Sequence, residues 1–238
     1  MNFFKKIFYL CKSRIWFYGI LNGIAATIEL EKLVKDIKTP ETIIDIGSNK
    51  GQFILLIEKI FPRKKIYSFE PIKEMIEKQK KFFKKRKNIF FYNLALGSSA
   101  SFKEFLMTNR VDSSSFLKIS QNQNKSKDYI VKEKRKIKVN TLDNIFRDEK
   151  LYHPILIKMD VQGYELEVLK GSNNMLKKID YILLEVSKNE MYKNQPTEEI
   201  IINYLKSLNF KIFKTNDWVN IKNTNFKQRD ILFSNNNE

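Results

Sequence analysis

Cysteine and histidine are almost absent from this 238-residue chain, which contains one of each, Cys11 and His153. A single cysteine excludes a disulfide bond within the chain, which fits a reducing compartment such as the cytoplasm. Long apolar runs are also lacking. The uncharged run from Ile15 to Ile28 is shorter than the about 20 residues that a membrane-spanning helix needs. The sequence therefore offers neither a disulfide framework nor a clear spanning segment.

The composition is that of a globular protein, because 42% of the residues are hydrophobic and 13% are aromatic. The length suits one α/β domain with a short appendage. Acidic residues are outnumbered, and the net charge of +17 would attract nucleic acid, anionic membranes or acidic glycans. The excess is mostly lysine, scattered among Ile, Phe and Asn, so we discount the charge as a guide to partners.

The first 39 residues form a separate N-terminal helical extension in our interpretation, and residues 40–238 form the main domain. Apolar residues in this extension are interspersed with lysine and arginine, and the helical pattern continues through Glu29 to Lys38 until Pro40 ends it. Residues 1–30 are either a basic amphipathic helix that touches a membrane surface or a helix that packs on the domain or covers the cofactor site. We favour the second interpretation.

A strand, a glycine turn and a helix follow one another from Thr42 to Ile60. This order is typical of the first unit of a doubly wound α/β sheet, which binds a nucleotide-like ligand where the strand ends. Gly47 would allow the turn at positive φ, and Gly51 would let a ligand approach the start of the helix.

Two common nucleotide motifs are missing from this turn. Asn49 stands where the middle glycine of a dinucleotide fingerprint would be, and Lys50-Gly51-Gln52 does not match a P-loop. The next strand, 65–69, ends in Glu70, which is placed to accept hydrogen bonds from a ribose diol. Together these features suggest S-adenosylmethionine, the alternative being an α/β protein with ordinary glycine turns.

The remaining pattern predicts alternating strands and helices. We expect helices over 73–87, 164–169 and 198–208, a short helix after Thr141, strands over 89–96, 101–107, 136–139, 154–160 and 181–186, and a final pair over 210–214 and 230–233. The polar segment 111–128 is interpreted as a mobile substrate loop, with plain disorder as the alternative for 120–128.

Several stretches resemble the FkbM family of methyltransferases, in the family's order and over about residues 40–235. They are Asp45-Ile46-Gly47-Ser48-Asn49-Lys50-Gly51-Gln52-Phe53, Phe69-Glu70-Pro71, Leu94-Ala95-Leu96-Gly97, Ser113-Ser114-Ser115, Thr141-Leu142-Asp143 and the long stretch from Lys158 to Gly171. The resemblance implies a Rossmann-like class I fold. Its seven-stranded, mostly parallel sheet has helices on both faces and one antiparallel strand near the C-terminus.

The resemblance also implies an S-adenosylmethionine-dependent O-methyltransferase that acts on a hydroxyl of a sugar, a glycan or a related small molecule. Glu70 should bind the ribose, and Ala95 should contact the adenine. The methionine part should be held by Asp45, Gly47, Asn49 and Gly51. Gln52, Phe53, Pro71 and Ser114, which lie in the matching motifs, are expected at the same cofactor site.

A hydroxyl acceptor needs a base or a metal near neutral pH. Asp160 ends the fourth strand of the sheet, the position from which class I methyltransferases address their acceptor, although it could instead cap the helix that follows. Gln162 could orient the acceptor, and Glu185 could share a cation such as Mg²⁺ with Asp160. His153 precedes that strand, so we expect it at the opposite edge of the sheet.

Two rival functions remain open. The first is methylation of nucleic acid, which the charge favours, although no Asn-Pro-Pro-Tyr-type motif follows the fourth strand. The second is a non-enzymatic, membrane-associated protein that keeps the fold. We expect a small-molecule or glycan acceptor, no nucleic acid, and a cytoplasmic location with contact to a membrane surface through residues 1–30 as an option.

Overall fold

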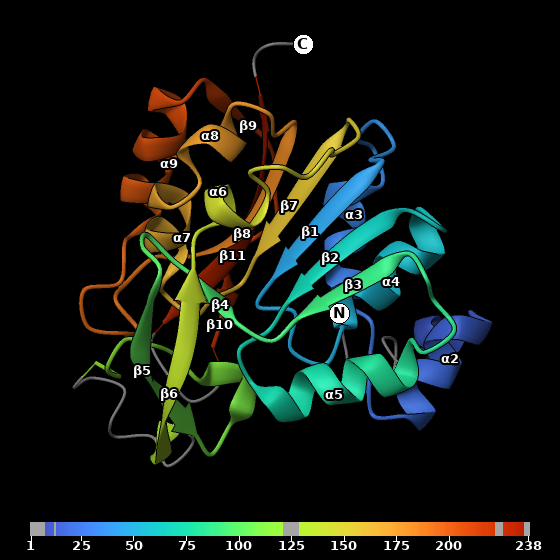
Figure 1. The fold of residues 1–238 in the computed structure, drawn as a ribbon, viewed down its shortest axis with the longest axis horizontal. Coiled ribbons are helices and arrows are strands. Elements are labelled where there is room, and N and C mark those ends of the chain that lie inside the picture. The colour runs from blue at the N-terminus through green and yellow to red at the C-terminus, as the bar shows by residue number, and fades with distance from the viewer. Residues whose placement is uncertain (1–7, 12, 121–128, 222–225, 236–238) are drawn as a thin grey trace.

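One twisted sheet of eight strands runs through the centre of the molecule, with helices on both of its faces (Figure 1). The computed structural model describes residues 8–11, 13–120, 129–221 and 226–235. The strands of the sheet are β1 (Thr42–Ile46), β2 (Lys65–Phe69), β3 (Ile89–Tyr92), β7 (Ile155–Met159), β8 (Tyr181–Ser187), β9 (Phe210–Thr215), β10 (Val219–Asn220) and β11 (Lys227–Asn235).

The order of the strands is that of a doubly wound sheet, β3-β2-β1-β7-β8-β11, and the first five pair in parallel. β11 runs antiparallel to β8, as predicted for one strand near the C-terminus. β9 and β10 both pair with the other edge of β11. The predicted count of seven strands was therefore one too low, because the chain pairs a second time with β11 through the two-residue β10.

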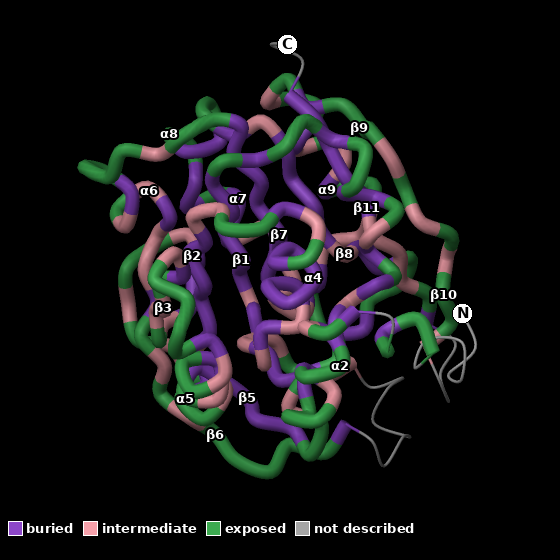
Figure 2. The backbone as a smooth tube through the Cα atoms, turned by 90° about the vertical axis from the view of Figure 1, so that its right-hand side faces the viewer, coloured by how far each residue is buried: buried purple, intermediate pink, exposed green. Residues whose placement is uncertain are grey.

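Alternate residues of the strands supply two separate cores, one on each face of the sheet. Ile43 packs with the helices of the first half of the chain, and its neighbour Ile44 packs with those of the second half. Figure 2 shows the central strands as the most continuously buried part of the chain. The helices are α2 (Arg14–Leu21), α3 (Glu31–Val34), α4 (Gln52–Ile60) and α5 (Lys73–Phe82) on one side and α6 (Leu142–Ile145), α7 (Glu165–Lys170), α8 (Asn173–Leu176) and α9 (Glu198–Ser207) on the other.

The third predicted strand, 89–96, is divided in two. β3 ends at Tyr92, and β4 (Ala95–Leu96) joins β5 (Ser101–Thr108) and β6 (Val131–Asn140) in a separate three-stranded sheet. The Asn93 side chain donates to the carbonyls of Glu70 (3.0 Å) and Pro71 (2.9 Å). This contact holds the chain where β3 leaves the main sheet.

Most other elements match their predicted ranges within a few residues, but α5 is shorter than predicted. It ends at Phe82 because Phe83 turns inward, where it is 2% exposed. The short α8 was not predicted, and β6 begins five residues before the predicted start at residue 136. Of the predicted loop over 111–128, residues 121–128 lie outside the described part.

The N-terminal extension is not the continuous helix predicted up to Lys38. α2 ends at Leu21, the chain turns through Gly23 at φ +69°, and a 3₁₀ turn, η1 (Ile28–Leu30), precedes α3. The Trp16 indole donates to the carbonyl of Leu55 in α4 (3.0 Å). α2 is thus packed on the domain. Within the described residues, no helix has the length and apolar character needed to cross a bilayer.

Candidate functional site

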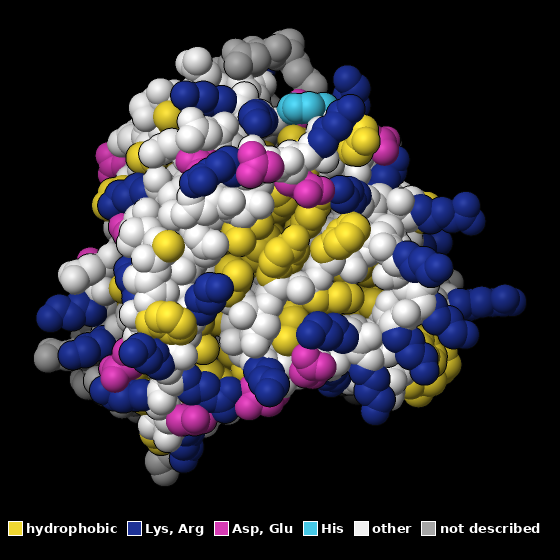
Figure 3. Space-filling view, viewed as in Figure 1, with side chains coloured by type: hydrophobic (Ala, Val, Ile, Leu, Met, Phe, Trp, Pro, Cys, Tyr) yellow, Lys and Arg dark blue, Asp and Glu magenta, His cyan; other side chains and the backbone are white. Residues whose placement is uncertain are grey.

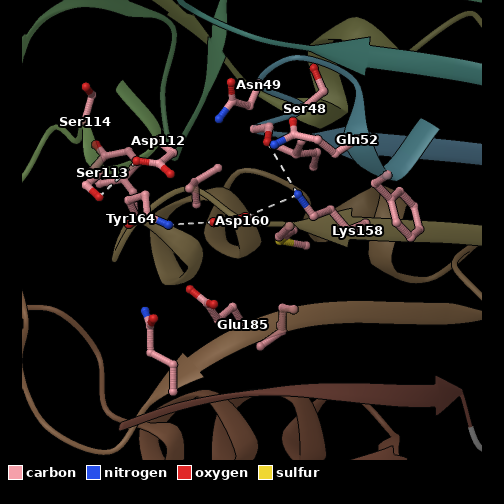
Figure 4. A pocket seen from close by; sticks show the side chains of 18 of the residues that line it. Ser48, Asn49, Gln52, Asp112, Ser113, Ser114, Lys158, Asp160, Tyr164 and Glu185 are labelled. Carbon is pink, nitrogen blue, oxygen red and sulfur yellow. Dashed lines mark hydrogen bonds and ion pairs between the residues drawn. The ribbon is translucent and has the colours of Figure 1, made fainter. Parts of the chain in front are cut away.

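The carboxyl ends of β1, β2, β7 and β8 meet around one cavity of about 480 Å³. A crevice at the carboxyl ends of parallel strands is the expected ligand site of such a sheet, and this volume is within the usual range for ligand pockets. Figure 4 shows side chains from β7, β8, the turn after β1 and the η2 turn (Val111–Ser113) around the cavity.

The turn between β1 and α4 forms one wall of the cavity. Gly47 has φ +73°, and a Cβ atom there would lie 1.9 Å from the carbonyl oxygen of Asp160. Only glycine therefore lets the end of β1 lie against the end of β7. Gly51 (φ +85°) does not line the cavity, and a Cβ atom there would lie 2.8 Å from Phe83, the residue after α5. In this structure the absence of a side chain at Gly51 makes room for Phe83 rather than for the predicted ligand approach.

Glu70 lines the cavity at the end of β2, as predicted. Its carboxylate accepts hydrogen bonds from the backbone N–H groups of Asn49 (2.7 Å) and Ile72 (2.8 Å). Burial raises the pKa of Glu70 to about 7, although these hydrogen bonds favour the charged form. The side chain is therefore fixed between two loops before any ligand binds.

A buried polar network that the sequence did not reveal supports this wall from behind. The Gln79 amide of α5 donates to the Ser48 hydroxyl (2.8 Å) and to the Asn49 carbonyl (2.5 Å), and Ser68 donates to Gln79 (2.7 Å).

The Asn49 side chain differs from this network, because its Oδ1 atom is buried without a hydrogen-bond partner in the structure, although Asn49 lines the cavity. Such an orphaned atom at a cavity wall is a position for a ligand donor.

Asp45 does not line the cavity and is completely buried. Its carboxylate makes no hydrogen bond and lies 3.6 Å from the Lys158 ammonium. Burial raises the pKa of Asp45 to about 6, against the attraction of Lys158. The predicted contact between Asp45 and the ligand is thus replaced in this geometry by a contact with Lys158.

Lys158 is the central cation of the site, and sequence reasoning gave it no role. Its ammonium lies 3.5 Å from Asp160 and donates to the carbonyl of Gly47 (3.4 Å). Burial lowers the pKa of Lys158, but the surrounding carboxylates outweigh burial and the net pKa is raised. The sequence feature that could have revealed this role is a single lysine within the otherwise apolar strand 155–159.

The loop between β7 and α7 carries the two predicted catalytic residues, Asp160 and Gln162, and both line the cavity. The Gln162 amide donates to Asp160 Oδ1 (2.7 Å), and the Tyr192 hydroxyl lies 2.9 Å from Gln162 Oε1. Gln162 has φ +53°, a conformation that non-glycine residues rarely adopt outside functional or strained sites.

The alternative capping role of Asp160 was wrong. Glu165 satisfies this turn instead, since its carboxylate accepts from the N–H groups of Val161 and Gly163 (3.2 Å each). Ser115 also holds the turn, because its hydroxyl donates to the Gln162 carbonyl (2.7 Å). Ser113, Ser114 and Ser115 are all buried, so this part of the predicted mobile loop is packed.

Two further carboxylates face the cavity from β8 and β11. Glu185 lies directly opposite Asp230 in the antiparallel register, and in Figure 4 its carboxylate points toward the Asp160 loop. Burial, then repulsion by Asp160 and Asp230, raises the pKa of Glu185 well above its usual value. Burial likewise raises the pKa of Asp230 to about 6.

The predicted Mg²⁺ site at Asp160 and Glu185 has no support in this geometry. Among the residues that the structure describes, no group of three or more His, Cys, Asp or Glu side chains could hold a metal ion. The two oxygens of Asp160 face Lys158 and Gln162 instead.

The remaining predicted residues lie where the sequence analysis expects them. Those that line the cavity are Gln52, Phe53, Pro71, Ala95 and Ser114. His153 lies before β7, where its Nδ1 atom is 2.8 Å from Asp180, and it does not line the cavity. Its expected place at the opposite edge of the sheet is confirmed.

Glu165 should make the stability of the folded protein depend on pH, because its buried carboxyl binds a proton more tightly than in the unfolded chain. Burial raises its pKa from 4.5 to about 7, so between these values the folded state keeps a proton that the unfolded state has lost. Stability should therefore fall as the pH rises from about 5 to about 7, by up to about 3 kcal/mol from this group. We expect the stability of Glu165→Gln, measured by thermal unfolding, to lack this fall between about pH 5 and pH 7. An identical pH dependence in both proteins would contradict the assignment.

Comparison with known proteins gives one family match and several similar folds. Residues 45–212 match the model of the methyltransferase FkbM domain. A curated relative, the hexuronic acid methyltransferase AglP of Haloferax volcanii, is 36% identical over 50 residues, which is 21% of each chain. The chain thus aligns with only about a fifth of that relative.

Two solved structures have similar folds. Magnesium protoporphyrin IX methyltransferase from Synechocystis, solved with bound S-adenosylmethionine, has a TM-score of 0.50 at 13% identity, over 99% of this chain and 85% of that one. An uncharacterized protein from Listeria monocytogenes serotype 4b has a TM-score of 0.51 at 11% identity, over 90% and 70%. At these identities the likeness shows the fold alone, which is the predicted class I methyltransferase fold.

Proposed function

The chain belongs to the FkbM methyltransferase family, and from this premise we propose that it transfers a methyl group from S-adenosylmethionine to a hydroxyl of a sugar, glycan or related small molecule. The observation that carries the proposal is that Gly47, Glu70, Asp160 and Gln162 line one cavity at the carboxyl ends of neighbouring strands. The curated relative, whose name gives a hexuronic acid as acceptor, supports a sugar as the substrate class.

The β1–β2 side of the cavity fits the cofactor. Glu70 is fixed by two backbone N–H groups and retains lone pairs for the two ribose hydroxyls. The buried Asn49 Oδ1 atom has no partner in the structure and can accept from the ammonium group of the methionine part. When bound, S-adenosylmethionine supplies a methyl group on a positively charged sulfur, and the protein supplies position and electrostatics.

The β7–β8 side fits the acceptor. Asp160 can accept the acceptor hydroxyl's hydrogen bond and take its proton as the new bond forms. Lys158 and Gln162 hold the Asp160 carboxylate in place, at 3.5 Å and 2.7 Å. Tyr192 in turn fixes Gln162, so the carboxylate is oriented before an acceptor arrives.

The charge of the cavity restricts the acceptor. The chain has a net charge of +17, yet the cavity lining contains six acidic residues, Glu29, Glu70, Asp112, Asp160, Glu185 and Asp230, and three basic residues, Arg110, Lys158 and Arg229. Arg229 is paired with Glu198, and Lys158 with Asp45 and Asp160. We therefore infer a neutral or cationic acceptor, because a uronate would add a further carboxylate beside Glu185 and Asp230, whose pKa values burial and mutual repulsion already raise.

Glu185 gives the sharpest test of this restriction. Wild-type protein should methylate a neutral methyl glycoside or an amino sugar with a higher kcat/KM than the matching uronate. At a pH above the raised pKa of Glu185, Glu185→Gln should raise the uronate-to-neutral ratio by about tenfold, because a repulsive charge worth about 1.4 kcal/mol is removed. Glu190→Gln, an exposed position outside the lining, is the control. A wild-type preference for the uronate would refute the inferred acceptor charge.

Transfer of a methyl label into a panel of neutral sugars, amino sugars, uronates and nucleic acids tests the function itself. Label in a sugar hydroxyl supports the proposal, and label in nucleic acid would replace it. The acidic cavity disfavours a phosphate backbone, which is why we rank the nucleic-acid function second. Cofactor binding without transfer to any acceptor would favour the non-enzymatic rival.

A further inference from the structure

α2 is apolar on all sides, but the domain covers only part of it. Its apolar residues are Ile15, Trp16, Phe17, Tyr18, Ile20 and Leu21. Trp16 and Gly19 face inward, where a Cβ atom on Gly19 would lie 2.3 Å from Leu55. A helix that is hydrophobic all round is normally buried all round.

The outer side of α2 exposes a patch formed by Phe17, Tyr18 and Leu21, which are 46%, 57% and 68% exposed. We call these three residues the α2 patch. They are spaced at i, i+1 and i+4, so they share one face of the helix. Large side chains exposed together on one face indicate an interaction surface, whereas single exposed ones do not.

Basic residues border the α2 patch. The Tyr18 ring lies 5.4 Å from the Phe82 ring of α5, and Lys78 of α5 donates to the carbonyl of Gly23 (3.4 Å). α5 and the turn after it continue with exposed Lys81, Lys84 and Lys85. Figure 3 shows hydrophobic side chains at the lower right, where α2 lies in Figure 1, bordered by dark-blue lysine and arginine side chains.

We propose that the α2 patch binds the surface of an anionic lipid bilayer. Aromatic and leucine side chains enter the boundary between headgroups and acyl chains, and flanking lysines attract anionic headgroups. The apolar centre of the patch fits the acyl boundary of the bilayer, and the basic border fits the anionic headgroups. The helix is short, so binding depends on the charges and is sensitive to salt.

The patch is continuous in the chain with the wall of the cavity. Thr27, Glu29 and Leu30 line the cavity, and they follow Leu21 after one turn. Trp16 locks the same segment to α4, whose residues Gln52 and Phe53 also line the cavity. Contact of α2 with a bilayer would therefore bring the cavity close to the membrane surface.

Cosedimentation of the full chain with vesicles tests the proposal without any methyl transfer. We expect binding to vesicles of phosphatidylglycerol mixed with phosphatidylcholine, and at least about tenfold weaker binding to phosphatidylcholine alone. Raising the salt until the Debye length falls from about 10 Å to about 3 Å should release the protein. The double variant Phe17→Ser/Leu21→Ser should bind at least about tenfold more weakly.

Matched controls separate the patch from general effects. Phe102→Ser removes a ring that is 63% exposed on β5, in the small sheet, and should leave binding unchanged. Lys81→Glu/Lys85→Glu should weaken binding, whereas Lys177→Glu/Lys178→Glu, on the far side of the molecule, should weaken it less. Circular dichroism and cofactor titration report whether each variant remains folded.

Three results would overturn the proposal. They are no binding of wild-type protein to anionic vesicles, equal binding of the Phe17→Ser/Leu21→Ser variant, and self-association of the wild-type protein that this variant abolishes. The last result would assign the patch to a second copy of the chain. None of these results bears on methyl transfer, so the two proposals can fail separately.

Discussion

Replacing Asp160 by Asn should lower kcat for methyl transfer by about a hundredfold or more without weakening cofactor binding. The amide keeps the shape of the side chain but cannot take a proton from the acceptor. Cofactor binding should persist because the proposed cofactor contacts, Asn49 and Glu70, directly follow β1 and β2, and the Gly47 contact with Asp160 involves only the backbone carbonyl. Isothermal titration with S-adenosylmethionine and a label-transfer assay measure the two effects separately.

Asp112→Asn is the matched control for Asp160, because Asp112 also lines the cavity but its carboxylate faces Arg110 on the η2 turn. This variant should retain most of the wild-type turnover. Unchanged kcat in Asp160→Asn would show that Asp160 is not the base and would leave positioning as its only role.

Replacing Glu70 by Ala should weaken S-adenosylmethionine binding by at least about tenfold, which corresponds to about 1.4 kcal/mol. Two effects add in this variant. The proposed hydrogen bonds to the ribose are lost, and the N–H groups of Asn49 and Ile72 lose their acceptor. Titration calorimetry measures the dissociation constant.

Glu70→Gln distinguishes these two effects, since its amide oxygen can still accept one backbone N–H. We expect this variant to bind the cofactor with an affinity between those of the wild type and Glu70→Ala. Glu77→Ala on the exposed side of α5 is the control for loss of a nearby charge. Equal affinity in Glu70→Ala and the wild type would contradict the assignment of the cofactor side.

Local patterns were enough to predict the strands β1, β2, β7 and β8, whose ends form the cavity, and the helix α4. The Ile-rich strand 42–46, the glycine turn and the helix from Gln52 depend on neighbours in sequence, and the structure places them as predicted. The position of Glu70 followed for the same reason, because the carboxyl ends of parallel strands meet at one edge of the sheet.

The side-chain contacts that the sequence did not predict join residues that are far apart in the chain. Asp45 turned away from the cavity because Lys158, 113 positions later in the chain, provides its counter-charge. Gly51 faces Phe83, which is 32 positions later in the chain. Each of these outcomes depends on a partner whose distance in space no local pattern encodes.

The two ends of the cavity are built from different parts of the chain. Ser115 and Tyr192 both form hydrogen bonds with Gln162, on the acceptor side of the cavity. The β1 turn and Glu70 lie on the other side. We therefore expect that exchanging the segment around residue 192 for that of a relative changes the Gln162 side of the cavity and leaves Glu70 and the β1 turn in place. The molecule is in this sense modular, and chimaeras grafted at this segment would be a practical route to new acceptors.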